Sequence, residues 1–87
     1  MMIYTKHALK RQQQRGISSE IIELVLTFGR QIYTRGALIY ALGRKEINAF
    51  SENFPELKGL NGLQVVTASD TGVIITCYRN RSFKGLR

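Results

Sequence analysis

The chain has 87 residues, a formal net charge of +7 and a composition of 44% hydrophobic and 22% charged residues. A chain of this length forms one domain, because two separate cores would each bury too little surface. The composition excludes a disordered, collagen-like or coiled-coil protein. The longest apolar run, Ala37–Leu42, is far shorter than the ~18–20 residues of a membrane span. Because residues 1–7 also lack the apolar core of a secretory signal, we expect a cytoplasmic domain.

Two helices are predicted at the start of the chain. Thr5 is a suitable N-cap, and Gly16 is a suitable stop for a first helix that ends at residue 14 or 15. Ser18 caps a second helix, rich in large apolar side chains, which Gly29 ends. The short link between these helices indicates that they pack as a pair.

After the second helix the apolar period changes to two, which predicts strands. We expect four of them, at residues 31–34, 36–42, 63–69 and 72–79. Between the two pairs, the spacing of Ile47, Phe50 and Phe54 predicts a helical insert from Arg44 to about residue 53, stopped by Pro55. A continuing strand at 45–47 is the alternative. The predicted fold is therefore α+β: two N-terminal helices packed on a four-stranded antiparallel sheet, with a short helical insert between the strand pairs.

Metal and disulfide chemistry have little support in the sequence. Cys77 and His7 are the only cysteine and histidine, so an internal disulfide and a zinc cage of four such ligands are excluded. The six carboxylates include no pair with metal-ligand spacing, and there is no phosphate-binding glycine loop. We therefore expect no cofactor and a buried, unreactive Cys77.

The excess of cations is the strongest compositional signal. Thirteen Lys and Arg residues stand against six Asp and Glu. Small basic domains often bind nucleic acid, because neutralising phosphates releases counterions. A surface that keeps the chain soluble, or that meets an acidic protein, is the alternative.

The first predicted helix places cations on one face. His7, Arg11 and Arg15 recur at i, i+4 and i+8, a spacing at which like charges repel. A bound phosphate would offset that repulsion. The alternative is structural: Arg11 would reach backbone carbonyls, or Glu20 or Glu23 of the second helix, and His7 would be a surface residue.

The last predicted strand offers a second group of polar side chains. Alternation directs Val73, Ile75 and Cys77 toward the core, and it places the hydroxyl groups of Thr76 and Tyr78 together on the other face. Threonine and tyrosine are ordinary strand residues, so this pattern is weak on its own.

Three segments together resemble a small bacterial family of domains of unknown function, DUF4258. They are His7-Ala8-x-x-Arg11-x-x-x-Arg15-Gly16-Ile17, Val65-Val66-Thr67 and Ile75-Thr76-x-Tyr78-Arg79-Asn80. That family is considered similar to the barnase–EndoU–colicin–RelE superfamily, which has two helices followed by a four-stranded antiparallel sheet. Many members of the superfamily are metal-independent ribonucleases or toxins, so the resemblance implies a fold and, by analogy, an activity.

The resemblance implies a toxin-like endoribonuclease that cleaves RNA by attack of its own 2′-hydroxyl. Such an enzyme needs a proton-transfer group near neutrality and hydrogen-bond donors for the phosphate. The candidate catalytic residues are His7, Arg11, Thr76 and Tyr78, and the candidate nucleic-acid contacts are Lys6, Arg15, Arg79 and Arg81. This site requires the first helix to lie along the last strand, and the insert at 44–55 could cover it.

Two other functions stay open at the level of sequence. One is a non-catalytic nucleic-acid-binding module that uses the same basic face. The other is a protein-interaction domain that docks an acidic, antitoxin-like partner. The oligomeric state is left open.

Overall fold

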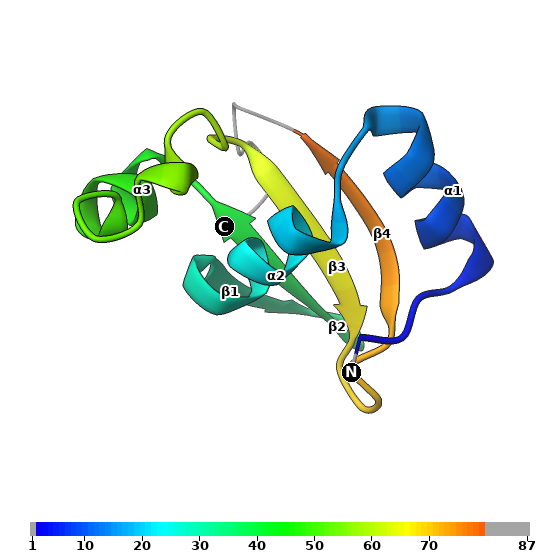
Figure 1. Cartoon of the computed structure of the whole chain (residues 1–87). Helices are drawn as coiled ribbons and strands as arrows, with labels where there is room; N and C mark the ends of the chain where they lie inside the picture. The colour runs from blue at the N-terminus through cyan, green and yellow to red at the C-terminus, as the bar shows by residue number, and fades with distance from the viewer. Residues whose placement is uncertain (1, 80–87) are drawn as a thin grey trace.

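A computed structural model describes residues 2–79 of the chain. Its helices and strands follow in the order α1 (Lys6–Arg15), α2 (Ser19–Phe28), β1 (Arg30–Thr34), β2 (Ala37–Leu42), α3 (Arg44–Phe50), the 3-10 helix η1 (Pro55–Leu57), β3 (Leu63–Ala68) and β4 (Ile74–Arg79). The strands form one antiparallel sheet in the order β1-β2-β3-β4, and α1 and α2 lie on one side of it (Figure 1). The predicted α+β fold is confirmed.

The core lies between α2 and the sheet. Ile22 and Val25 of α2 are fully buried and belong to one cluster with Leu42, Leu63 and Val65 from the central strands. Ser18 caps α2 through its hydroxyl, which accepts a hydrogen bond from the backbone N–H of residue 21 at 3.2 Å. Helix α2 is rich in apolar side chains because one of its faces packs on the core.

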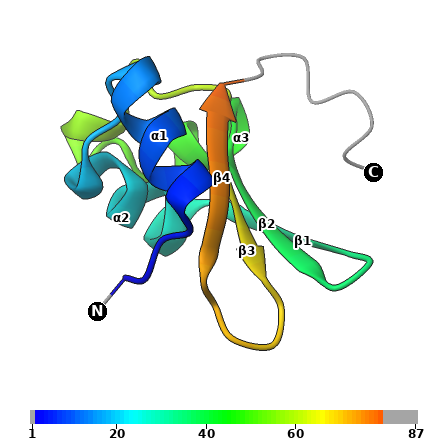
Figure 2. The same ribbon diagram turned by 90° about the vertical axis from the view of Figure 1, so that its right-hand side faces the viewer.

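Helix α1 packs along the edge strand β4, with Ala8 fully buried in the core, and both ends of the helix are fixed as well (Figure 2). Just before it, Tyr4 forms a parallel bridge with Ile74. The hydroxyl of Thr5 accepts a hydrogen bond from the N–H of Ala8 at 3.1 Å and donates one to the carbonyl of residue 75 at 3.0 Å. At the other end Gly16 takes a left-handed conformation, with φ of 62°. The requirement that the first helix lie along the last strand is met.

Strand β4 departs from simple alternation. Ile74, rather than Ile75, lies in the core beside Cys77, and both are 1% exposed. The register of β3 and β4 shifts between Val66 and Thr67, which makes Ile75 the extra residue of a β-bulge. The predicted core set of the strand was therefore wrong at this position, although the burial of Cys77 is confirmed.

The helix of the insert is shorter than predicted, and a second helical segment follows it. Helix α3 ends at Phe50, and Pro55 begins η1 instead of simply stopping a helix. The rings of Phe50 and Phe54 pack against Phe28 of α2, with centroids 5.1 and 4.6 Å away, so tertiary contact sets where α3 ends. The insert lies at the end of the molecule away from α1 (Figure 1). It does not cover the α1 face, and the alternative of a strand at 45–47 is wrong.

Candidate functional site

Helix α1 exposes cations and carries no carboxylate. Four of its ten residues are Lys or Arg, and Ala8 is its one buried residue. Lys6, His7, Lys10 and Arg15 are exposed, and Arg11 is half-buried. The helix therefore presents donors to solvent along most of its surface, because its small buried face needs only an alanine.

A shallow hollow of about 150 Å³ lies on this helix. Its lining consists of His7, Lys10, Arg11 and Gln14, which follow one another at i, i+3, i+4 and i+7 and so share a face. No carboxylate lines it. Ammonium, guanidinium and amide groups all donate hydrogen bonds, so the hollow suits an anion with several acceptor oxygens, such as a phosphate.

A larger hollow of about 430 Å³ lies at the C-terminal end of α1. Arg15 of α1 and Arg79 of β4 both line it, together with Gln14 and four apolar side chains, Ile17, Ile21, Leu60 and Leu63. The Nη2 atom of Arg79 donates a hydrogen bond to the carbonyl of Gly59 at 2.9 Å, which holds the guanidinium in place. Since Gln14 lines both hollows, they adjoin. We call Lys6, His7, Lys10, Arg11, Arg15 and Arg79 the basic face.

Arg15 also acts on the core beneath it. Burial raises the pKa of the Cys77 thiol above its usual value, and the positive charge of Arg15 opposes that rise. The net effect keeps the thiol protonated at neutral pH, which fits a structural cysteine and not a nucleophile.

Thr76 and Tyr78 lie on the other face of the sheet. Their neighbour Cys77 pairs with Val65 on the helix side, so alternation places both hydroxyl side chains opposite the helices. Both are half-buried, and burial raises the pKa of Tyr78.

The predicted site residues thus fall into groups. Within residues 2–79 no hydrogen bond joins the hydroxyl pair of β4 to His7 or Arg11. The fold brings His7 to Arg11 and Arg15 to Arg79. Arg81 lies outside the described residues.

Two residues of the hollows were missed by the sequence argument. Lys10 and Gln14 stand three and seven positions after His7, a spacing that could have identified them as members of the same helix face. Among the described residues, no ion pair joins Arg11 to Glu20 or Glu23. The carboxylates of Glu20 and Glu23 instead line a different groove on α2.

Within residues 2–79, no three His, Cys, Asp or Glu side chains gather so as to hold a metal ion, and no helix has the length and apolar content needed to traverse a bilayer.

Comparisons with known proteins place these features in a family. The model of a family described as "Domain of unknown function (DUF4258)" matches residues 4–79, which include both hollows and all the strands. Comparison with curated proteins and with solved structures gives no match.

Proposed function

The chain belongs to the DUF4258 family, and from that premise we propose that it binds RNA through the basic face. The observation that carries the proposal is the pair of adjoining hollows, which four cations line and no carboxylate. Arginine and lysine bind phosphate by charge-assisted hydrogen bonds, and arginine does so with two donors at once.

The composition of the larger hollow favours a nucleotide over a bare anion. Its apolar side chains, Ile17 and Leu60 among them, would accept the face of an unstacked base, while Arg15 and Arg79 would contact the phosphates on either side. Single-stranded nucleic acid can present an unstacked base in this way, because its bases are not held in a double helix. We choose RNA over DNA as the ligand because of the resemblance to ribonucleases and toxins described in the sequence analysis.

The energetics of α1 also favour an anionic ligand. Two cation pairs, Lys6 with Lys10 and Arg11 with Arg15, stand at i and i+4 on a helix that offers no internal carboxylate to neutralise them. Like charges at this spacing destabilise a helix by a few tenths of a kcal/mol per pair. A bound phosphate would attract these cations, so their clustering would stabilise the complex instead of destabilising the helix.

Binding is tested with fluorescently labelled single-stranded RNA, whose anisotropy is followed at several salt concentrations. Lys10→Gln/Arg11→Gln should weaken binding about tenfold and should reduce the salt slope by about 1.4, because each lost phosphate contact removes ~0.7 from the slope. The matched control is Arg44→Gln/Lys45→Gln on α3, which removes the same charge at exposed positions away from the basic face. An equal loss in both variants would contradict the proposal, since it would reflect net charge alone.

A stronger form of the proposal adds metal-independent cleavage of the bound RNA. The 2′-oxygen attacks the neighbouring phosphorus, the bond to the 5′-oxygen breaks, and a cyclic phosphate and a 5′-hydroxyl result. His7 would accept the proton of the 2′-hydroxyl and return one to the 5′-oxygen, and Arg11 would stabilise the charge on the crowded phosphate. The observation that favours this form is the hollow shared by His7 and Arg11. RNA that passes over the edge strand β4 would also meet Thr76 and Tyr78.

Cleavage is tested by incubating mixed RNA with the protein in EDTA and resolving it on a denaturing gel. Wild type should give fragments, while His7→Ala and Arg11→Ala should not, with melting temperatures unchanged because neither residue is fully buried. Lys45→Ala is the control. Intact RNA together with a salt-sensitive mobility shift would reduce the function to binding. No shift at all would assign the basic face to an acidic, antitoxin-like protein partner.

A further inference from the structure

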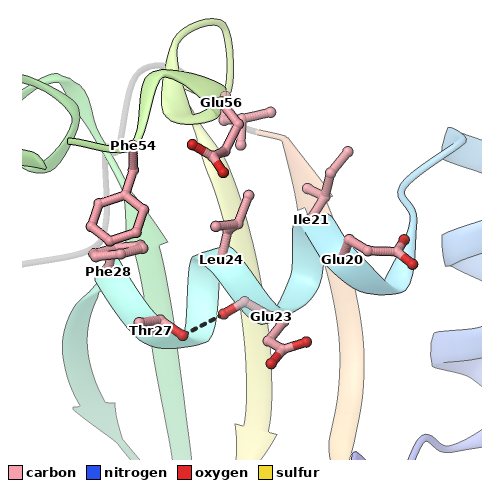
Figure 3. A pocket seen from close by; sticks show the side chains of 9 residues that line it. Glu20, Ile21, Glu23, Leu24, Thr27, Phe28, Phe54 and Glu56 are labelled. Atoms are coloured by element: carbon pink, nitrogen blue, oxygen red, sulfur yellow. Dashed lines mark hydrogen bonds between the residues drawn. The ribbon is translucent and has the colours of Figure 1, made fainter. Parts of the chain in front are cut away.

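The outer side of α2 carries an apolar groove that adjoins the larger basic hollow. It has a volume of about 670 Å³ and runs between α2 and the segment that contains η1 (Figure 3). Leu24 projects from α2 into its middle, and the rings of Phe28 and Phe54, tilted by 48° against each other, close one end. Phe54 is 40% exposed although its ring contacts Phe28, so part of the ring is open to a ligand.

Acidic side chains border this groove. Glu20 stands at the end opposite the phenylalanines, Glu56 hangs over Leu24 from η1, and Glu23 lies on the outer edge of α2 (Figure 3). They are three of the six carboxylates in a chain with thirteen cations, yet no Lys or Arg lines the groove. The surface is thus divided into a basic face, which α1 and Arg79 supply, and this acidic groove.

We propose that the groove is the docking site of a basic amphipathic helix from a partner protein. Apolar anchors one turn apart would contact Leu24 and the exposed ring of Phe54. Lysine or arginine residues beside those anchors would meet Glu20, Glu23 and Glu56. The stretch from Glu20 to Phe28 spans ~12 Å at 1.5 Å per residue, which matches about two helical turns of the partner.

Charge complementarity excludes the competing ligands in turn. RNA is repelled by the three carboxylates. A second copy of the chain would have to offer α1, its basic helix, but Leu9 is the one strongly exposed apolar side chain that α1 presents. One anchor does not fill a groove that holds several apolar side chains. Ile21 and Leu60 line both this groove and the larger basic hollow, so the two sites adjoin.

The test uses a labelled synthetic peptide of fourteen residues, with leucines at i, i+3, i+4 and i+7, lysines on both flanks and alanines elsewhere. Its binding to the whole protein is followed by fluorescence anisotropy. Two control peptides are a scrambled version of identical composition and a version with glutamate in place of lysine. The amphipathic basic peptide should bind at least tenfold more tightly than either control.

Variants of the protein assign the binding to the groove. Phe54→Ala and Glu23→Gln/Glu56→Gln should each weaken peptide binding about tenfold. The matched control, Glu52→Gln/Asp70→Asn, removes the same charge outside the groove and should leave it unchanged. If Phe54→Ala does not fold, as judged by its melting curve, Leu24→Gln replaces it, since Leu24 is only half-buried.

Three results would overturn the proposal. Equal binding of the scrambled peptide would mean attraction by charge without a groove. Unchanged binding to both the aromatic and the acidic variants would place the peptide elsewhere. Self-association of the wild-type chain in sedimentation runs, abolished by Glu23→Gln/Glu56→Gln, would assign the groove to a second copy.

Discussion

Helices α1 and α2 have the same length and opposite construction. Each has ten residues and a hydroxyl side chain as N-cap, Thr5 for α1 and Ser18 for α2. Helix α1 has four Lys or Arg residues, no carboxylate and one buried residue. Helix α2 has two carboxylates and no cation, and most of its side chains are apolar. Helix α2 packs on the two central strands through a wide apolar face, whereas α1 packs along β4 through the narrow face of Ala8 and is fixed at its N-terminal end by Thr5. The narrow buried face of α1 leaves most of its cations exposed, where a ligand can reach them.

The first prediction concerns burial in α2. Ile22→Ala removes a fully buried side chain and should lower the free energy of unfolding by about 3 kcal/mol. Arg11→Ala on α1 should change it by less than about 0.5 kcal/mol, as expected of a residue outside the core. Urea denaturation of both variants measures the difference. A similar loss in the two would mean that α1 also depends on its face.

The second prediction concerns the glycines that follow the two helices. A Cβ on Gly29 would lie 2.5 Å from the carbonyl oxygen of Val25, so Gly29→Ala forces the backbone to shift and should cost about 2–3 kcal/mol. Gly16 has open space around it, but its φ of 62° is left-handed. Gly16→Ala should therefore cost only ~1 kcal/mol. Thermal melts of the pair provide the comparison, and a larger loss at Gly16 would contradict the assigned causes.

The third prediction tests the attachment of α1 at its N-terminal end. Thr5→Ala removes the cap and the hydrogen bond to β4, and it should cost about 1.5 kcal/mol. Thr5→Ser keeps the hydroxyl and should recover most of that loss. Hydrogen exchange of the α1 amides reports the same change locally, and it should accelerate in Thr5→Ala while α2 stays protected. Uniform acceleration in both helices would show that α1 is not a separately anchored element.

The fourth prediction concerns pH and has the smallest effect near neutrality. Burial raises the folded-state pKa of Cys77 above 9.0, so the folded protein retains a proton that the unfolded chain loses. Stability should be insensitive to this thiol below about pH 8. It should fall as the pH rises above the unfolded value of about 9. Denaturation of wild type and Cys77→Ala between pH 7 and 10 checks this, and a steeper fall in the variant would contradict the sign.

Local signals explain why both helices were predicted with nearly their observed bounds. Thr5, Gly16 and Ser18 act within a few residues of the helix ends, and their roles are independent of the rest of the fold. Strand periodicity is equally local. The end of α3 is not, because it depends on aromatic contacts with Phe28, which is distant in sequence.

The candidate site was predictable along one helix and not across elements. Helical spacing correctly grouped His7 with Arg11. No spacing rule connects Arg15 with Arg79, which meet only because α1 lies along β4. The hydroxyl groups of Thr76 and Tyr78 lie on the sheet face opposite the helices, as alternation predicted, so helix spacing and strand alternation alone do not connect them with the α1 residues.

The acidic groove was missed for a related reason. Glu20 and Glu23 have a sufficient local explanation, because carboxylates near a helix N-terminus are stabilised by its dipole. Glu56 and Phe54 come to α2 from a later segment of the chain. A groove made from two segments leaves no periodic signal in either.

In the functions proposed above, α1 binds a ligand, whereas α2 packs on the core with one side and binds a partner with the other. The most direct test is an NMR titration of the isotope-labelled protein with a short single-stranded RNA, followed through backbone amide shifts. We expect the perturbed amides to lie in residues 6–15 and at Arg79, with those of Leu24–Phe28 unchanged. Perturbations centred on α2, with α1 unaffected, would contradict it.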